Sequence, residues 1–164
     1  MPSISVPLKG QTGWDAMVNK RRAFWREGKN NQLSPHFKAT EFFTHDGTPP
    51  PPVARNAMVR LCKEFLEPMR AKFGGSCLIL SGYRHQAYNA AIGGARHSQH
   101  IYDDSYESVA ADTRYPKGTP TAWGAYAKTL RTKRKPKGAG GVGIYPKSGF
   151  VHIDNRLYQA NWSG

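Results

Sequence analysis

Two short stretches concentrate the residue types that could do chemistry. "SQHIYDDSYESVAAD" contains His100 and ends at Asp112, and "GFVHID" contains His152 and ends at Asp154. Successive side chains of a strand point to opposite faces. If the second stretch is a strand, His152 and Asp154 share one face and the aliphatic residues take the other. A strand of this pattern hides its aliphatic side chains and builds a polar site opposite them.

Two histidines and one carboxylate, His100, His152 and Asp112, form a ligand set that suits Zn²⁺ and leaves a position for water. Zinc would lower the pKa of that water to about 7. Spacing alone leaves a structural His–Asp hydrogen bond as an alternative. Four other histidines are possible rivals as ligands: His36, His45, His85 and His97.

The composition describes one domain with a modest core. The chain has 164 residues, and 38% of them are hydrophobic. No run approaches the ~20 apolar residues of a membrane span. The N-terminus has no apolar stretch of signal-peptide length, so we expect no export signal.

The charge balance is strongly basic, with 24 Lys and Arg against 11 Asp and Glu, a net charge of +13. Such a field favours polyanionic partners: nucleic acid, anionic membranes or anionic cell-wall polymers. Part of the charge lies in "KTLRTKRKPKG" at the C-terminal end of a predicted helix. The negative end of the helix dipole favours Lys and Arg there, so this part of the charge does not require an anionic ligand. Cys62 and Cys77 are expected to be free core thiols rather than a disulfide.

The helical patterns lie mostly in the first two thirds of the chain. We predict a basic arm over residues 1–33 with one short amphipathic helix, "WDAMVNKRRAFWRE", and a domain over 34–164. Ser34-Pro35 predicts a helix start, and "TPPPPV" an extended connector. A long helix should run from Val53 to Gly74-Gly75, and Pro68 should kink it or shift its register.

Further helices are expected over residues 85–94 and 119–133, the second capped by Thr119 with Pro120 at its first position. A buried strand is predicted at 77–84 and another at 108–115. "GVGIYP" and "GFVHIDNR" predict a hairpin joined by "PKSG". Helices that precede a small antiparallel sheet indicate an α+β fold.

Several motifs together resemble the zinc D-Ala-D-Ala carboxypeptidase family of peptidoglycan peptidases, which is related to the lysostaphin and hedgehog N-terminal folds. They are "LSPHFKATEF", "LEPMRAKFG", "LSGYRHQAYNAAIGGARHSQH", "VAAD" and "GGVGIYPKSGFVHID", from Leu33 to about Arg156. The resemblance implies a hedgehog/D,D-peptidase-like fold, a small antiparallel sheet flanked by helices, with Zn²⁺ as cofactor.

The resemblance also implies roles for single residues. The family's metal ligands fall on His100, Asp112 and His152, and its serine falls on Ser98. Its arginine falls on Arg84, where substrate binding and oxyanion stabilisation are implied; a surface ion pair is the alternative.

Three tyrosines, Tyr83, Tyr102 and Tyr145, could line the groove and donate hydrogen bonds to a peptide carbonyl. For any one of them, packing in the core with its hydroxyl at the surface is the favoured alternative.

The chain departs from the family in two places. Twelve positions separate His100 from Asp112, more than is usual, so Asp103, Asp104 and Glu107 are expected on an inserted loop. This loop is either a solvated surface feature, a lip that selects a cationic substrate group, or a source of extra metal ligands.

The second departure concerns the general base. Relatives often place Glu, Asp or His shortly before the second metal histidine, whereas here "PKSG" occupies those positions. Asp154 is the remaining candidate. Its alternative role is to accept the other N–H of the His152 ring and fix its tautomer.

Three functions are therefore weighed. The first is a zinc peptidase that cuts peptidoglycan stem peptides as a D,D-carboxypeptidase or an endopeptidase. We expect it in a phage or prophage lysin released from the host cytoplasm by a holin, or carried on a virion. The second is a tail or capsid component that binds other virion proteins and retains the fold. A nucleic-acid binder ranks last, since no binding motif supports it.

Overall fold

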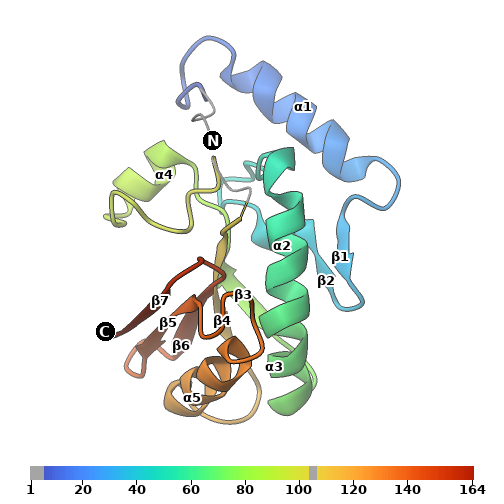
Figure 1. The fold of residues 1–164 in the computed structure, drawn as a ribbon. Helices are drawn as coiled ribbons and strands as arrows, with labels where there is room; N and C mark the ends of the chain where they lie inside the picture. Colours follow the sequence, from blue (N-terminus) through green and yellow to red (C-terminus); the bar gives the residue numbers. More distant parts are fainter. Residues whose placement is uncertain (1–5, 104–106) are drawn as a thin grey trace.

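The computed structural model describes residues 6–103 and 107–164, and its architecture is α+β (Figure 1). The helices are α1 (Trp14–Arg26), α2 (Arg55–Leu61), α3 (Glu67–Lys72), α4 (Gln86–Ala91) and α5 (Pro120–Arg131). The strands are β1 (Gln32–Ser34), β2 (Phe37–Lys38), β3 (Leu78–Ser81), β4 (Ala110–Arg114), β5 (Gly140–Tyr145), β6 (Phe150–Asp154) and β7 (Gln159–Ser163). The α+β class predicted from the sequence is confirmed.

The long helix predicted after the proline run is present and changes register in its middle. A π-helical turn, Cys62–Leu66, joins α2 to α3. There the Glu67 amide bonds to the Cys62 carbonyl, five residues back. Pro68 follows directly and has no N–H to continue an α-helical ladder. The predicted shift of register at Pro68 is therefore confirmed.

The main sheet has the strand order β3-β4-β6-β5-β7. The first four strands pair antiparallel, and β5 and β6 form the predicted hairpin with Tyr145 opposite Phe150. The small antiparallel sheet gains a fifth strand, because β7 pairs parallel to β5. The sequence did not indicate β7, since its residues are partly exposed and mostly polar.

The predicted strand at 77–84 is shorter and more exposed than expected. β3 lies at an edge of the sheet and has one neighbour, β4. Leu78 is 55% exposed. An apolar run indicates a buried strand only when both of its faces are covered, and an edge strand lacks part of that cover.

The core lies between the sheet and the helices α2, α3 and α5 (Figure 1). Val142, Val151 and Ile153 point into it from the sheet and are fully buried. Cys62 and Cys77 are free thiols, as predicted, with Cys62 buried and Cys77 partly buried. Burial raises the pKa of the Cys77 thiol to about 12.

The helix start predicted at Ser34-Pro35 is wrong, because β1 and β2 form a small hairpin there. The Glu67 carboxylate explains the difference. It accepts hydrogen bonds from the Ser34 hydroxyl at 2.6 Å and the His36 amide at 2.9 Å, and it pairs with the His36 ring. Ser34 therefore contacts α3 and does not cap a helix, and the next helical turn is a 3₁₀ turn at Ala39–Phe42.

The proline run is extended to Pro51 and then forms a 3₁₀ turn at Pro52–Ala54. Its carbonyl groups hold α1 in place. Trp25 is 2% exposed and donates its indole N–H to Pro50, and the Arg21 guanidinium donates to the Pro49 carbonyl. The short helix of the basic arm thus packs on the rest of the chain, while the division at residues 33 and 34 stays a prediction. Among the helices that the structure describes, none has the length and apolarity of a membrane span.

Candidate metal centre

One row of residues crosses the whole sheet on the face opposite the core. In register, Ser81, Asp112, His152, Gly143 and Trp162 are successive neighbours on β3, β4, β6, β5 and β7. Cross-strand neighbours share a face and lie close together. The row therefore brings a carboxylate beside an imidazole although 40 residues separate them.

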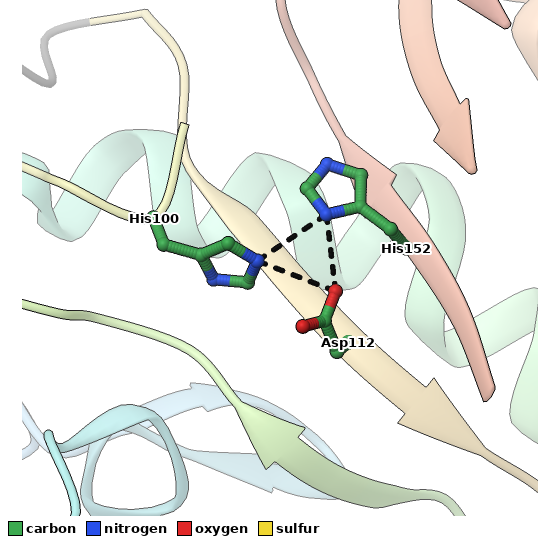
Figure 2. A group of neighbouring side chains, drawn as sticks. All are labelled: His100, Asp112 and His152. Carbon is green, nitrogen blue, oxygen red and sulfur yellow. Dashed lines mark hydrogen bonds and ion pairs between the residues drawn. The ribbon is translucent and has the colours of Figure 1, made fainter. Parts of the chain in front are cut away.

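His100 reaches this row from the loop before β4 (Figure 2). Its Nε2 lies 3.3 Å from Asp112 Oδ1 and 3.2 Å from His152 Nδ1, and His152 Nδ1 lies 3.0 Å from the same carboxylate oxygen. All three residues are buried. Among the described residues, they are the one group of three His, Cys, Asp or Glu side chains placed to hold a metal ion. The three ligands predicted from the sequence thus lie together.

The outer hydrogen bonds determine which ring nitrogens face inward as acceptors. His100 Nδ1 lies 2.7 Å from the Gly82 carbonyl oxygen, which can only accept, so this nitrogen carries the proton. His152 Nε2 lies 2.8 Å from Asp154 Oδ2, so in the neutral ring the proton sits there. In neutral rings, His100 Nε2 and His152 Nδ1 therefore both present lone pairs to Asp112.

Two lone pairs and a carboxylate oxygen facing one another repel unless a cation lies among them. The donor set of two imidazole nitrogens and one carboxylate oxygen is one that zinc prefers, and three protein ligands are typical of a catalytic zinc site. The residues present therefore fit zinc. Bound there, zinc would supply Lewis-acid chemistry, by polarising a carbonyl group and making water more acidic.

The pKa values of these three groups result from a competition between burial, which disfavours the charged form, and the neighbouring charges and hydrogen bonds. Burial raises the pKa of Asp112, but hydrogen bonds and charge attraction from the two rings in their protonated forms outweigh burial and hold the pKa far below its usual range. Burial lowers the pKa of His100. Burial also acts downward on His152, but the Asp112 and Asp154 carboxylates outweigh it and raise the pKa of that ring.

Asp154 is sealed behind His152. Its side chain is fully buried. Arg156 donates to both of its oxygens at 2.7 Å, and the Gly141 amide donates to Oδ1 at 3.0 Å. Together with the bond to His152, these contacts engage both oxygens, and no face of the carboxylate opens to solvent.

The metal ligands line an open pocket of about 350 Å³, a volume within the range of small-ligand sites. Arg84 stands at its wall, where the guanidinium donates to Asp112 Oδ2 at 3.4 Å and to the Ser81 hydroxyl at 2.9 Å. Ser98 and Tyr145 also line the pocket. Ser98 accepts a hydrogen bond from the His100 amide, and the Tyr145 hydroxyl accepts one from Trp162.

Two of the three tyrosines predicted as groove residues lie elsewhere. Tyr83 is 1% exposed, and its hydroxyl accepts a hydrogen bond from Arg21 of α1. Tyr102 is fully buried and donates to the Ala110 carbonyl. Tyr83 thus packs against α1 and Tyr102 against β4, away from the pocket wall. Core packing applies to both, but their hydroxyls are bonded inside the protein and do not lie at the surface as that alternative had it.

Two pocket residues, Trp162 and Arg156, were missed by sequence reasoning. The Trp162 ring lies 4.9 Å from the His152 ring, and the Arg156 guanidinium lies 5.4 Å from the Trp162 ring. For Trp162 the signal was the glycine pattern of "GGVGIY"; nothing in the pattern indicated Arg156. A Cβ at Gly143 would lie 2.4 Å from the Trp162 indole nitrogen, and one at Gly141 would lie 2.2 Å from Asp154 Oδ2.

The acidic loop before β4 does not form a second ligand set among the described residues. Asp103 is buried and lines a small separate cavity with Trp14 and His85, and Glu107 is exposed. Asp104 lies outside the described residues. Neither Asp103 nor Glu107 lines the metal pocket.

The basic cluster at the end of α5 consists of buried arginines and exposed lysines. Arg131 and Arg134 are buried. Arg134 pairs with Glu64 at 2.7 Å and donates to the Asn155 carbonyl, so it fastens the loop after β6. The lysines of the cluster are exposed: Lys128, Lys133, Lys135 and Lys137. The buried arginines thus have a structural role that needs no anionic ligand, while the expected attraction between the helix end and these cations stays a prediction.

A buried His–Asp–His set on the open face of an α+β sheet is typical of the metal-dependent hydrolases to which the motifs pointed. The sequence profile of the Peptidase M15 family matches residues 35–154. The chain therefore belongs to the peptidase M15 family, with His100, Asp112 and His152 as its candidate metal site. A search of curated proteins returned no match.

Proposed function

We propose that this chain is a zinc-dependent peptidase that hydrolyses the stem peptides of peptidoglycan. The observation that carries the proposal is the convergence of three acceptor atoms in an open pocket of a peptidase-family chain. Two of them are ring nitrogens, and hydrogen bonds on the far side of each ring fix its tautomer. His100, Asp112 and His152 would hold the ion.

Arg84 is proposed to bind the substrate and to stabilise negative charge on its carbonyl oxygen. A guanidinium that is already fixed by Ser81 and Asp112 needs no reorganisation when that charge develops. Ser98 and Tyr145 are proposed to contact the peptide, since both line the pocket.

Of the two roles considered for Asp154, we propose the orienting one. A general base must reach the proton that it removes. Both Asp154 oxygens are engaged, and the side chain is fully buried. Its contact with His152 Nε2 is the kind that fixes the tautomer of a metal-binding histidine.

The test combines metal analysis with hydrolysis of purified peptidoglycan, and compares the wild-type chain with His100→Ala. We expect about one zinc per wild-type chain, and peptide products that vanish on chelation and return with added zinc. His100→Ala should lack both zinc and products. Release of free D-alanine would indicate a carboxypeptidase, and loss of cross-linked fragments an endopeptidase.

His36→Ala is the matched control, because His36 is half exposed and pairs with Glu67 outside the pocket. It should retain zinc and activity. A wild-type chain that binds no zinc would refute the ligand assignment.

The second candidate is a virion structural component that retains the fold. The absence of an acidic or imidazole side chain in "PKSG" before β6 favours it. Stoichiometric zinc without hydrolysis would support this candidate. Anionic wall polymers are proposed as partners of either form, because the exposed lysines at the end of α5 supply the charge.

A further inference from the structure

Among the residues that the structure describes, the metal pocket lacks a carboxylate that could exchange protons with a substrate. The described lining contains Asp112, which belongs to the ligand set, and no other Asp or Glu. Asp154 is sealed behind His152. Peptide hydrolysis nevertheless needs a group that removes a proton from water and one that protonates the departing amine. Another pocket residue must supply this function if the proposed hydrolysis occurs.

His97 is the pocket-lining residue with the required chemistry. Its side chain is exposed and lines the pocket together with the three ligands. Within the described residues, no hydrogen bond or ion pair engages its ring. An imidazole can both accept and donate a proton near neutral pH, which the permanently charged guanidinium groups of Arg84 and Arg156 cannot do.

The loop that carries His97 is fixed by its own hydrogen bonds. The Ser98 amide bonds to the Ala95 carbonyl, and the Ile101 amide to the Ser98 carbonyl. The Ser98 hydroxyl accepts from the His100 amide at 3.1 Å. The same short loop therefore positions His100 as a ligand and His97 at the pocket wall, three residues earlier.

His97 also lines a second cavity, of about 480 Å³, beside the first. A peptide that extends from the metal site into this cavity would pass the imidazole. The titratable and charged groups on the walls that His97 shares are Arg84, Arg96, His100, Asp112, Tyr145, His152 and Arg156.

We propose that His97 is the general base and general acid of the hydrolysis, a role that rests on the proposed peptidase function. The water oxygen attacks the carbonyl carbon while one water proton moves to a ring nitrogen of His97. The C–N bond then breaks, and His97 gives that proton to the departing amine nitrogen. The products are a free amine and a carboxylic acid, which loses its proton to solvent.

The experiment compares wild type, His97→Gln and His97→Ala on purified peptidoglycan, with zinc content measured for each. We expect a loss of about 10²- to 10⁴-fold in kcat, a KM within threefold of wild type and unchanged zinc. Added imidazole should restore part of the activity of His97→Ala, and His36→Gln should behave as wild type.

Three results would overturn the role: a kcat within threefold of wild type, a raised KM with unchanged kcat, or loss of zinc from His97→Gln. The last would make His97 a metal ligand or a structural residue. A wild-type chain without hydrolytic activity would overturn the peptidase function itself and this role with it. The wild-type measurement thus separates the two failures.

Discussion

At the residue scale, the metal site depends on hydrogen bonds that face away from it. The Gly82 carbonyl holds the proton of His100 on Nδ1, and Asp154 holds the proton of His152 on Nε2. Each bond leaves the opposite nitrogen as an acceptor aimed at Asp112. Strand register and the loop before β4 thus bring the ligands together, and these outer partners determine which ring nitrogens present lone pairs to the site.

Asp154→Asn tests this arrangement. The asparagine amide can donate toward His152 Nε2 and so favour the tautomer with its proton on Nδ1, inside the site. We expect zinc affinity to fall about 10- to 100-fold, measured by competition with a chelator. Unchanged affinity would remove the orienting role.

Asp46→Asn is the matched control, because Asp46 Oδ2 makes a similar bond to His85 at 2.7 Å, outside the metal pocket. It should leave zinc affinity unchanged. Burial raises the pKa of both carboxyls, but hydrogen bonds outweigh it and hold both far below the usual range. Both aspartates therefore stabilise the fold above about pH 4, and the stability that either variant loses should shrink as the pH falls.

At the scale of elements, β7 places Trp162 in the pocket wall, and it can do so because Gly143 on the neighbouring strand β5 has no side chain. Trp162 reaches His152 across Gly143, which lies between them in register. A Cβ at this position would lie within 2.9 Å of three indole atoms. The glycine is therefore required by the close approach of the ring, and the wall of the pocket depends on it.

Gly143→Ala should displace Trp162 and lower the free energy of unfolding by about 1–3 kcal/mol, as measured by urea denaturation. The same substitution in a Trp162→Ala background should cost much less, because the clashing ring is absent. A double-mutant cycle measures this coupling. Equal costs in the two backgrounds would show that Trp162 does not account for the glycine.

The π-helical turn is the second element with a local cause. Pro68 interrupts the hydrogen-bond ladder, and the helix accommodates it with a bond from Glu67 to Cys62. The helix therefore continues, and Glu67 also accepts the hydrogen bonds of Ser34 and His36. One residue thus joins the helix to the β1–β2 hairpin.

At the scale of the whole molecule, a bound ion would tie together three segments distant in sequence: the loop of His100, β4 and β6 (Figure 2). A ligand that binds only the native state adds to stability, by about 2.7 kcal/mol at a concentration of 100 Kd. Chelation should therefore lower the Tm of the zinc-loaded chain by roughly 5–10 °C, as measured by calorimetry. His100→Ala should show no zinc-dependent change.

The zinc-dependent gain in Tm should shrink as the pH falls. The raised pKa of His152 in the metal-free chain means that its proton stabilises that form at low pH and is lost as the pH rises. Zinc must displace this proton, so below the raised pKa its affinity should fall about tenfold per pH unit for one proton. Chelator competition across a pH series measures how zinc affinity changes with pH. A zinc affinity that does not change with pH would contradict protonation of His152.

The sequence by itself determined the parts that depend on local spacing. The alternation of "GFVHID" placed His152 and Asp154 on one face. Pro68 indicated a shift of helix register, and Thr119 indicated the start of α5. These features follow from backbone geometry and from hydrogen bonds within a few residues. Residue types also offered His100 and Asp112 as ligands beside His152. The family resemblance supported this set and added Arg84, and the structure brings all four residues to one pocket.

The tertiary structure alone decided which side chains face the pocket. Asp154 is sealed by Arg156 and Gly141, Tyr83 packs against Arg21, and Trp162 arrives on a parallel strand. Most of these contacts join segments that are far apart in the chain. Exposure depends on which surfaces such segments cover, and local sequence patterns do not encode that. The same packing leaves His97 on the pocket wall and buries Asp154 behind the metal ligands.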